Sequence, residues 1–279
     1  IGALVLLVQG RYRMLLDKIS LFFGSFEKRV SPAILDTALV ELSDLVCLVD
    51  SALDGGAAMV AERSEREWRA RGYSTLVLRC DALGRLNASV TLPEGLEPLV
   101  AGRLSSWPSL GSNLVRLEIH SLAGFGQPEV LVTWLTEVVA GAQTASFEAI
   151  LCWHDHYLIC PTKHLLDRHN QYCGVPTESD CKHCLPKNAN CLPAELRSMD
   201  IVLWRQRWGQ LLERVTQIRV FSKSSAELVS GSWPDQRGKI HFLPHETTHL
   251  STVTVSIQSD SPLNIGVIGK INLHKGAAK

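Results

Sequence analysis

The sequence has no excess of charge of either sign. Its 28 Lys and Arg residues balance 28 Asp and Glu residues, and charged residues make up 20% of the chain. A balanced chain has no overall basic field that would attract nucleic acid or an anionic membrane surface. We therefore expect no nucleic-acid partner, and function must reside in local groups of residues.

The sequence also lacks the long apolar run that a membrane helix needs. The apolar run at residues 3–8 is soon followed by Arg11 and Arg13, whereas a spanning helix takes about 20 apolar residues. No basic segment precedes this run, so it does not have the pattern of a signal peptide. We expect a cytoplasmic protein, and Ile1 in place of Met suggests a trimmed or excised chain.

Cysteine is sparse except in one segment. Cys47 and Cys80 stand alone in apolar runs, as small buried thiols do. The other six lie within forty residues: Cys152, Cys160, Cys173, Cys181, Cys184 and Cys191. In a cytoplasmic chain such a cluster favours metal binding over disulfides.

Short apolar runs alternate with helical patterns and predict an α/β fold. The run Leu45–Val49 resembles a strand buried on both faces, and a Gly55-Gly56 loop, a charged helix ending at Gly72 and a strand at 74–79 follow it. This order is a βαβ unit. Further strands are predicted at 87–92, 114–120, 147–153, 218–221 and 239–243, and helices at 127–141 and 195–214. The predicted fold is a Rossmann-like, doubly wound parallel sheet with a Cys-rich irregular insertion at 160–195.

The chain divides into three predicted parts. Residues 1–42 form a helical segment, residues 43–260 form the Rossmann-like domain, and residues 261–279 form a linker and the first strand of another domain. The last division depends on Asp260-Ser261-Pro262, which is typical of a linker, and on the apolar run that follows it.

The Gly55-Gly56 loop predicts an anion site. Glycines allow close approach of the backbone, and the free N–H groups of the following helix attract phosphate or diphosphate. The same pattern also fits a tight turn without a ligand. A nicotinamide-dependent dehydrogenase is a further alternative, because Asp81 ends the next strand where a ribose-binding acid would lie. The loop lacks the G-x-G-x-x-G spacing of that class.

His154, Asp155 and His156 follow the predicted strand 147–153. In α/β sheets, functional groups gather beyond the carboxyl ends of strands. An imidazole there can accept a proton or hydrogen-bond a sugar hydroxyl, while a neighbouring carboxylate fixes its tautomer. A structural polar corner is the alternative interpretation.

Cys160, Cys173, Cys181 and Cys184 have the spacing C-x12-C-x7-C-x2-C. The close pair can bind one side of a zinc ion, and the two distant thiolates can complete a tetrahedral structural site. His164, His183 and Cys191 are alternative ligands, and reduced thiols in a loop remain the alternative without metal.

Together these motifs resemble bacterial family 4 glycosyltransferases. Similarity lies in Gly55-Gly56-Ala57 before a charged helix, in H-D-H-Y-L-I-C-P at 154–161, and in Y-C-G and C-K-H-C-L further on. The cysteines are similar to those of a subgroup associated with cell-surface polysaccharide assembly. The run G-K-I-N-L-H-K-G at 269–276 resembles the G-R-L-x-x-x-K-G loop that opens the family's donor domain.

The resemblance implies a GT-B architecture of two Rossmann-like domains and transfer of a sugar, with retention, from a nucleotide-sugar to a glycan or lipid-linked acceptor. No metal is implied for the chemistry, and peripheral membrane association through the acceptor is compatible with it. The implied roles are catalysis by His154 and Asp155, donor binding by Gly55, Gly56, Lys270 and Lys275, and acceptor binding by His156 and Tyr157.

Two departures from the family pattern affect this interpretation. Lys270 replaces an Arg, which removes a forked grip on the diphosphate. The sequence also ends before the family's E-x7-E pair, so we expect residues 1–279 alone to be inactive. Two other functions stay open: a non-catalytic, zinc-stabilised interaction domain derived from such an enzyme, and a nicotinamide-dependent oxidoreductase.

Overall fold

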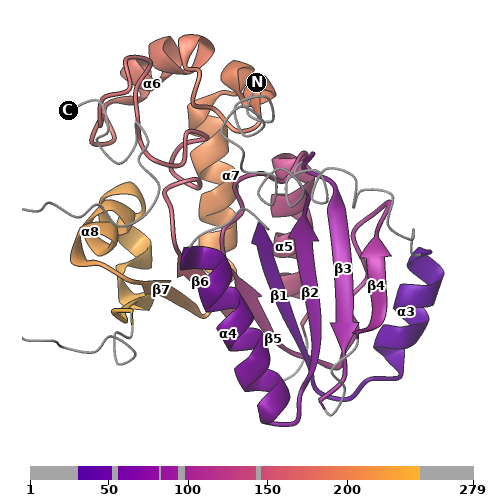
Figure 1. Cartoon of the computed structure of the whole chain (residues 1–279). Helices are drawn as coiled ribbons and strands as arrows, with labels where there is room; N and C mark the ends of the chain where they lie inside the picture. The colour runs from indigo at the N-terminus through magenta and orange to yellow at the C-terminus, as the bar shows by residue number, and fades with distance from the viewer. Residues whose placement is uncertain (1–30, 52–55, 82, 94–97, 143–145, 246–279) are drawn as a thin grey trace, which may run out of the picture.

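The computed structural model describes residues 31–51, 56–81, 83–93, 98–142 and 146–245, arranged around one eight-stranded sheet (Figure 1). The strand order is β4-β3-β2-β1-β5-β6-β7-β8. The strands are β1 (Leu45–Ser51), β2 (Ser74–Cys80), β3 (Leu86–Thr91), β4 (Pro98–Arg103), β5 (Leu114–Ile119), β6 (Glu148–Trp153), β7 (Gln217–Val220) and β8 (Ile240–Phe242). The helices are α3 (Pro32–Val40), α4 (Gly56–Ala70), α5 (Pro128–Gly141), α6 (Glu178–Cys184), α7 (Ile201–Arg214) and α8 (Lys223–Ser232).

Most of the sheet is parallel, which confirms the predicted α/β class. Strand β1 pairs in parallel with β2 and β5, and the parallel order continues through β6, β7 and β8. The prediction of a wholly parallel sheet is wrong at one edge, where β3 and β4 run antiparallel. The β2–β3 connection spans only residues 81–85, which is too short for the crossover that parallel pairing needs.

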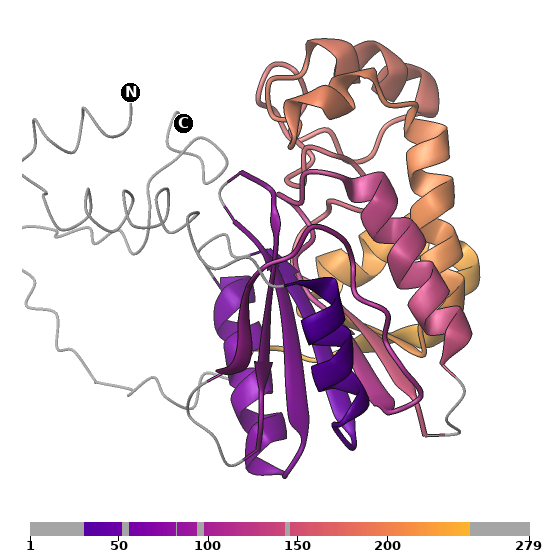
Figure 2. The same cartoon turned by 90° about the vertical axis from the view of Figure 1, so that its right-hand side faces the viewer.

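Helices cover both faces of the sheet (Figure 2). Helix α4 lies against β1 and β2 on one face, where Val46, Leu48 and Val77 form a small buried cluster near Trp68. The alternate residues of β1, such as Cys47, belong to the main core with α5 and α7. This alternation is what a strand covered on both faces requires. Leu35 and Leu39 bring α3 into the same core.

Local residues explain where several helices begin and end. Helix α4 is followed by Gly72, whose φ of 90° lies in the left-handed region that favours glycine. The helix expected over 195–214 divides in two, because Asp200 accepts hydrogen bonds from Val202 and Leu203 N–H and so caps a new helix, α7. The segment 160–195, expected to be irregular, contains the short helix α6.

Some predictions lie outside the described residues. These are the second-domain strand, Lys270 and Lys275, together with Gly55 of the glycine loop. Among the helices that the structure does describe, none has the length and apolar character needed to cross a membrane.

Candidate functional site

The candidate site lies where the chain reverses its direction of travel across the sheet. From β1 the chain passes to β2 on one side, and it later returns to β5 on the other. A crevice outside the carboxyl ends of such strands is the usual place for a ligand in open α/β sheets. The polar residues at these ends are Asp50 and Ser51 on β1, His120 and Ser121 after β5, and His154 and Asp155 after β6.

Ser121 joins the ends of all three strands. Its hydroxyl donates to Asp155 Oδ2 at 2.8 Å, and its backbone N–H donates to Asp50 Oδ1 at 3.2 Å. Asp155 Oδ1 also accepts from the Tyr157 N–H at 3.0 Å. Both oxygens of Asp155 are therefore engaged in holding the loop after β6, and its hydrogen bonds do not go to the neighbouring His154.

Two polar atoms at the end of β1 are buried without a hydrogen-bond partner among the described residues. They are Asp50 Oδ2 and Ser51 Oγ, on side chains that are fully buried. Burial raises the pKa of Asp50 to about 6, although His120 and the Ser121 N–H oppose the rise. Buried polar groups are normally paired, so these two atoms mark a position where a ligand can supply the partners.

His154 is held by a second histidine. Its Nε2 lies 3.0 Å from His120 Nδ1, and its ring stacks on Phe221 with a centroid distance of 4.7 Å. Burial, together with the neighbouring His120 and His245, lowers the pKa of His154 to about 3. The imidazole is therefore neutral at physiological pH, where it can accept a hydrogen bond.

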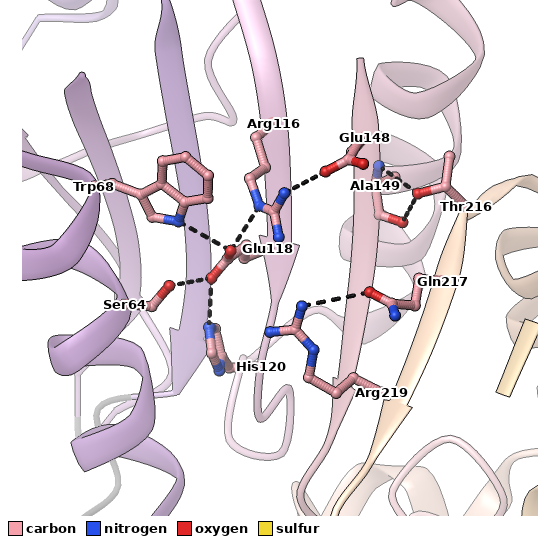
Figure 3. Close-up of polar contacts among 10 residues, drawn as sticks. All are labelled: Ser64, Trp68, Arg116, Glu118, His120, Glu148, Ala149, Thr216, Gln217 and Arg219. Carbon is pink, nitrogen blue, oxygen red and sulfur yellow. Dashed lines mark hydrogen bonds and ion pairs between the residues drawn. The ribbon is translucent and has the colours of Figure 1, made fainter. Parts of the chain in front are cut away.

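Glu118 lies behind His120 on β5 (Figure 3). His120 Nε2 is 3.6 Å from Glu118 Oε2, which is an ion-pair contact longer than an ordinary hydrogen bond. Burial alone would raise the pKa of Glu118, but the nearby His120, the hydrogen bond from Ser64 and the charge of Arg116 outweigh it and keep the pKa far below its usual range. Glu118 is therefore an ionised carboxylate inside the fold.

The sequence interpretation missed Glu118 and His120. The sequence does contain a signal that could have identified them. A charged residue two positions before a histidine in a buried strand lowers the stability of the fold unless both residues are paired. The pairing itself depends on the lateral alignment of β5 with β6 and α4, which the sequence alone does not give.

The same corner has the ligand atoms to hold a metal ion. Within the described ranges, the one group of three His, Cys, Asp or Glu residues with ligand atoms within 4.8 Å of one another is His120, Cys152 and His154. Burial and the Glu118 charge raise the pKa of the Cys152 thiol to about 12. A metal ion there would have to displace that proton.

The four cysteines predicted to bind zinc line one cavity of about 400 Å³, which also includes Asp180 and His183. All eight cysteines are free thiols. The four sulfur atoms do not reach the 4.8 Å mutual spacing found for His120, Cys152 and His154. The fold therefore brings Cys160, Cys173, Cys181 and Cys184 to one place without the compact arrangement of a metal-bound site.

The residues predicted to bind the acceptor have different environments. His156 is partly buried, and its Nδ1 accepts from Trp153 Nε1 at 3.2 Å. Tyr157 is fully buried, with its ring edge-on to Trp204 at 5.2 Å. Tyr157 is thus a core residue, and its predicted contact with an acceptor does not fit this position.

Gly56 and Asp81 bear on the two predicted nucleotide sites. Gly56 is the first residue of α4, and among the described residues beyond its own helix and chain neighbours no atom lies within 4 Å of a Cβ added there. Packing against these described residues therefore does not require this glycine. Asp81 instead uses its carboxylate in its own turn, accepting from Leu83 and Arg85 N–H and pairing with the Arg85 side chain.

Comparison of the chain with family models, with curated proteins and with solved structures gives no match. The arrangement of Asp50, His120 and His154 at the strand ends is therefore the basis on which a function is proposed.

Proposed function

We propose that this domain is the acceptor-side half of a GT-B glycosyltransferase that transfers a sugar from a nucleotide-sugar to a hydroxyl of a glycan or lipid-linked acceptor. The observation that carries the proposal is the buried His154, with a pKa lowered to about 3, at the same edge of the sheet as Asp50 Oδ2, which has no partner among the described residues. Polar groups at this edge fit a polyhydroxylated ligand, because each sugar hydroxyl can both donate and accept a hydrogen bond.

The donor side of the proposal depends on α4. This helix is 15 residues long, and its first turn contains no acidic residue. Its N-terminus has a positive dipole end and free N–H groups, which stabilise a diphosphate. Gly56 has no Cβ, and no described residue beyond its own helix and chain neighbours would contact one there, which fits the close approach of such a group. Lys270 and Lys275 would pair with the diphosphate from the second domain.

The buried carboxylate of Asp50 favours a ligand-binding protein over a purely structural module. Keeping Asp50 ionised in a buried position costs stability above its pKa of about 6. Buried ionisable groups that lower stability in this way are frequent at functional sites, where a ligand interacts with the group. The dehydrogenase alternative is weaker, since the Asp81 carboxylate is already engaged with Arg85 and with its own turn.

We further propose that Cys160, Cys173, Cys181 and Cys184 bind one structural zinc ion. They contribute to the walls of one cavity beside the loop after β6, and burial raises the pKa of the thiols of Cys160, Cys173 and Cys181. Four thiolates would close the coordination shell, so the ion would stabilise the loop and take no part in sugar transfer.

The test uses the protein expressed at its natural length, with whatever sequence flanks residues 1–279. Turnover of a panel of nucleotide-sugars is measured with glycan and lipid-linked acceptors, and with vesicles present for membrane-associated acceptors. His154→Ala should lower kcat by about 100-fold or more, which is the usual loss for a positioned polar group. His241→Ala is the matched control, because this histidine is exposed on β8. Unchanged kinetics in a folded His154→Ala protein, or binding of nicotinamide cofactors in place of nucleotide-sugars, would overturn the proposal.

A further inference from the structure

A groove of about 970 Å³ is lined by α7, by α8 and by residues of the segment 172–178. Its volume lies within the range of about 300–1,000 Å³ that is usual for ligand sites. None of Asp50, His120 and His154 belongs to its walls. The groove is therefore separate from the candidate site at the strand ends.

Trp233 forms an apolar part of the groove wall and is held in one orientation. Its Nε1 donates to the Arg205 carbonyl oxygen at 3.3 Å, and its ring stands edge-on to Trp153 with a centroid distance of 6.1 Å. The ring lies so close to Gly209 that a Cβ added there would come within 2.9 Å of Nε1. Because Nε1 is the one polar atom of the indole and is already paired, the half-buried ring offers the groove a hydrocarbon surface. A ring ordered in advance loses little entropy when a ligand packs on it.

Two amide side chains on α7 supply polar groups to the same groove. Gln206 and Gln210 are four positions apart, which places them on one face of the helix. Both line the groove, both are exposed, and neither side chain forms a hydrogen bond with another described residue. A primary amide has two donor hydrogens and an acceptor oxygen, so each can bind hydroxyl groups as donor and as acceptor.

The charges of the groove disfavour a phosphorylated ligand. Its one cationic side chain is Arg205, whose Nε already donates to the Ile159 carbonyl oxygen at 3.1 Å. The carboxylates that line it are those of Glu178, Glu213 and Glu227. Phosphate and diphosphate groups are bound by cations with free donors, which this groove lacks among its described residues. A neutral ligand with many hydroxyl groups fits the amides, the carboxylates and the apolar ring together.

We propose that the groove between α7 and α8 binds a neutral glycan, with one sugar ring packed on Trp233 and its hydroxyls hydrogen-bonded to Gln206 and Gln210. The C–H groups on the face of a sugar ring carry a slight positive charge, which the negative face of an aromatic ring attracts. Glycan binding here does not depend on the function proposed above, whereas the use of the groove by an acceptor chain does. A basic peptide is the competing occupant, because the three carboxylates would attract it.

The experiment screens the protein at its natural length on an array of neutral oligosaccharides, and then titrates those that bind by calorimetry. Gly231→Leu is the blocking variant. Gly231 lines the groove, and no described residue beyond its own helix and chain neighbours lies within 4 Å of a Cβ added there. Leucine should therefore fill the groove without displacing the described residues around it, and weaken binding by about 10-fold or more. Gly141→Leu on α5 is the matched control, because Gly141 has equally open surroundings outside the groove.

A second variant tests the amides. Gln206→Ala combined with Gln210→Ala changes only exposed side chains and should weaken binding by about 10-fold, which is the usual loss for two hydrogen bonds. This variant also decides the matter if Gly231→Leu does not fold.

Three results would overturn the inference: no bound oligosaccharide on the array, binding that the groove variants leave unchanged, or binding of a hexalysine peptide in place of glycans that Gly231→Leu removes. Because the binding measurement needs no sugar transfer, its outcome is independent of activity. Glycan binding in a protein without transferase activity would defeat the proposed function alone. Transferase activity in a protein that binds no glycan in this groove would defeat this inference alone.

Discussion

The hydroxyl of Ser121 donates a 2.8 Å hydrogen bond to Asp155 Oδ2 and so joins the loop after β5 to the loop after β6. The same residue's N–H reaches Asp50 on β1. Through its side chain and its backbone N–H, this one residue joins three strand ends that carry the candidate site. The adjacent strands are aligned by parallel pairing, and contacts of this kind join the loops beyond them.

Ser121→Ala should reduce the free energy of unfolding by about 1–2 kcal/mol, because it leaves a partly buried carboxylate oxygen without its donor. Ser198→Ala is the control, since that hydroxyl is exposed and donates to the Glu195 carbonyl. Ser198→Ala should change the free energy of unfolding by no more than about 0.5 kcal/mol. Urea denaturation of the three proteins measures the difference. Equal midpoints for all three would contradict the role given to Ser121.

Asp50→Asn should stabilise the protein at high pH and not at low pH. The pKa of Asp50 is raised from 3.8 to about 6, mainly by burial, so the folded state binds its proton more tightly than the unfolded state. Stability linked to this group is thus present below pH 3.8 and is lost as pH rises to about 6, at a cost of roughly 3 kcal/mol. Asn has no such charge to bury.

The measurement is the free energy of unfolding of wild type and Asp50→Asn between pH 4 and pH 8. The variant should become the more stable protein above pH 6, while its binding of nucleotide-sugar or acceptor falls. A difference between the two proteins that does not change with pH would show that Asp50 is not a raised, buried acid.

Substitutions of Tyr157 test whether this residue is part of the core or binds the acceptor. Its hydroxyl is buried without a partner among the described residues. Tyr157→Phe should therefore leave stability unchanged or raise it by up to about 2 kcal/mol, and leave acceptor binding unchanged. Tyr157→Ala should cost about 3–5 kcal/mol by leaving a cavity beside Trp204. A large loss of acceptor affinity in a stable Tyr157→Phe protein would restore the binding role.

Much of the fold could be predicted from sequence because its signals are local. The apolar run at β1 and the glycine after α4 each have a physical meaning within a few residues. Strand β4 and helix α8 were missed because their local sequence signals are weak. Gly102 weakens the strand pattern, and α8 is rich in serine, although Ser222 does cap it by accepting from the Ser225 N–H.

The partner of His154 could not be predicted, because it depends on distance in space. Asp155 is adjacent in sequence, yet its oxygens point to Ser121 and Tyr157. The actual partner, His120, is 34 positions away and meets His154 only because β5 and β6 lie side by side. Sequence position identified the edge of the sheet, while strand alignment decided which groups touch.

The last prediction assigns zinc to the cysteine cavity. We expect about one zinc ion per chain in protein purified without chelator, measured by elemental analysis. The predicted site must be separated from the alternative group of His120, Cys152 and His154. Cys184→Ser should lose the ion if Cys160, Cys173, Cys181 and Cys184 hold it, and Cys152→Ser should keep it. The opposite pattern would assign the metal to the histidine corner.

Two further measurements depend on the thiol protons. Burial raises the pKa of Cys160, Cys173 and Cys181, and neighbouring thiols add to the rise. Zinc must displace these protons, so its affinity should fall as pH is lowered, with release of protons on binding. Removing the ion should lower Tm, because loop residues 160–195 contain few large apolar side chains to hold them by burial alone. Chelation without any change in Tm, or less than about half an equivalent of zinc at neutral pH, would rule out a structural ion in this loop.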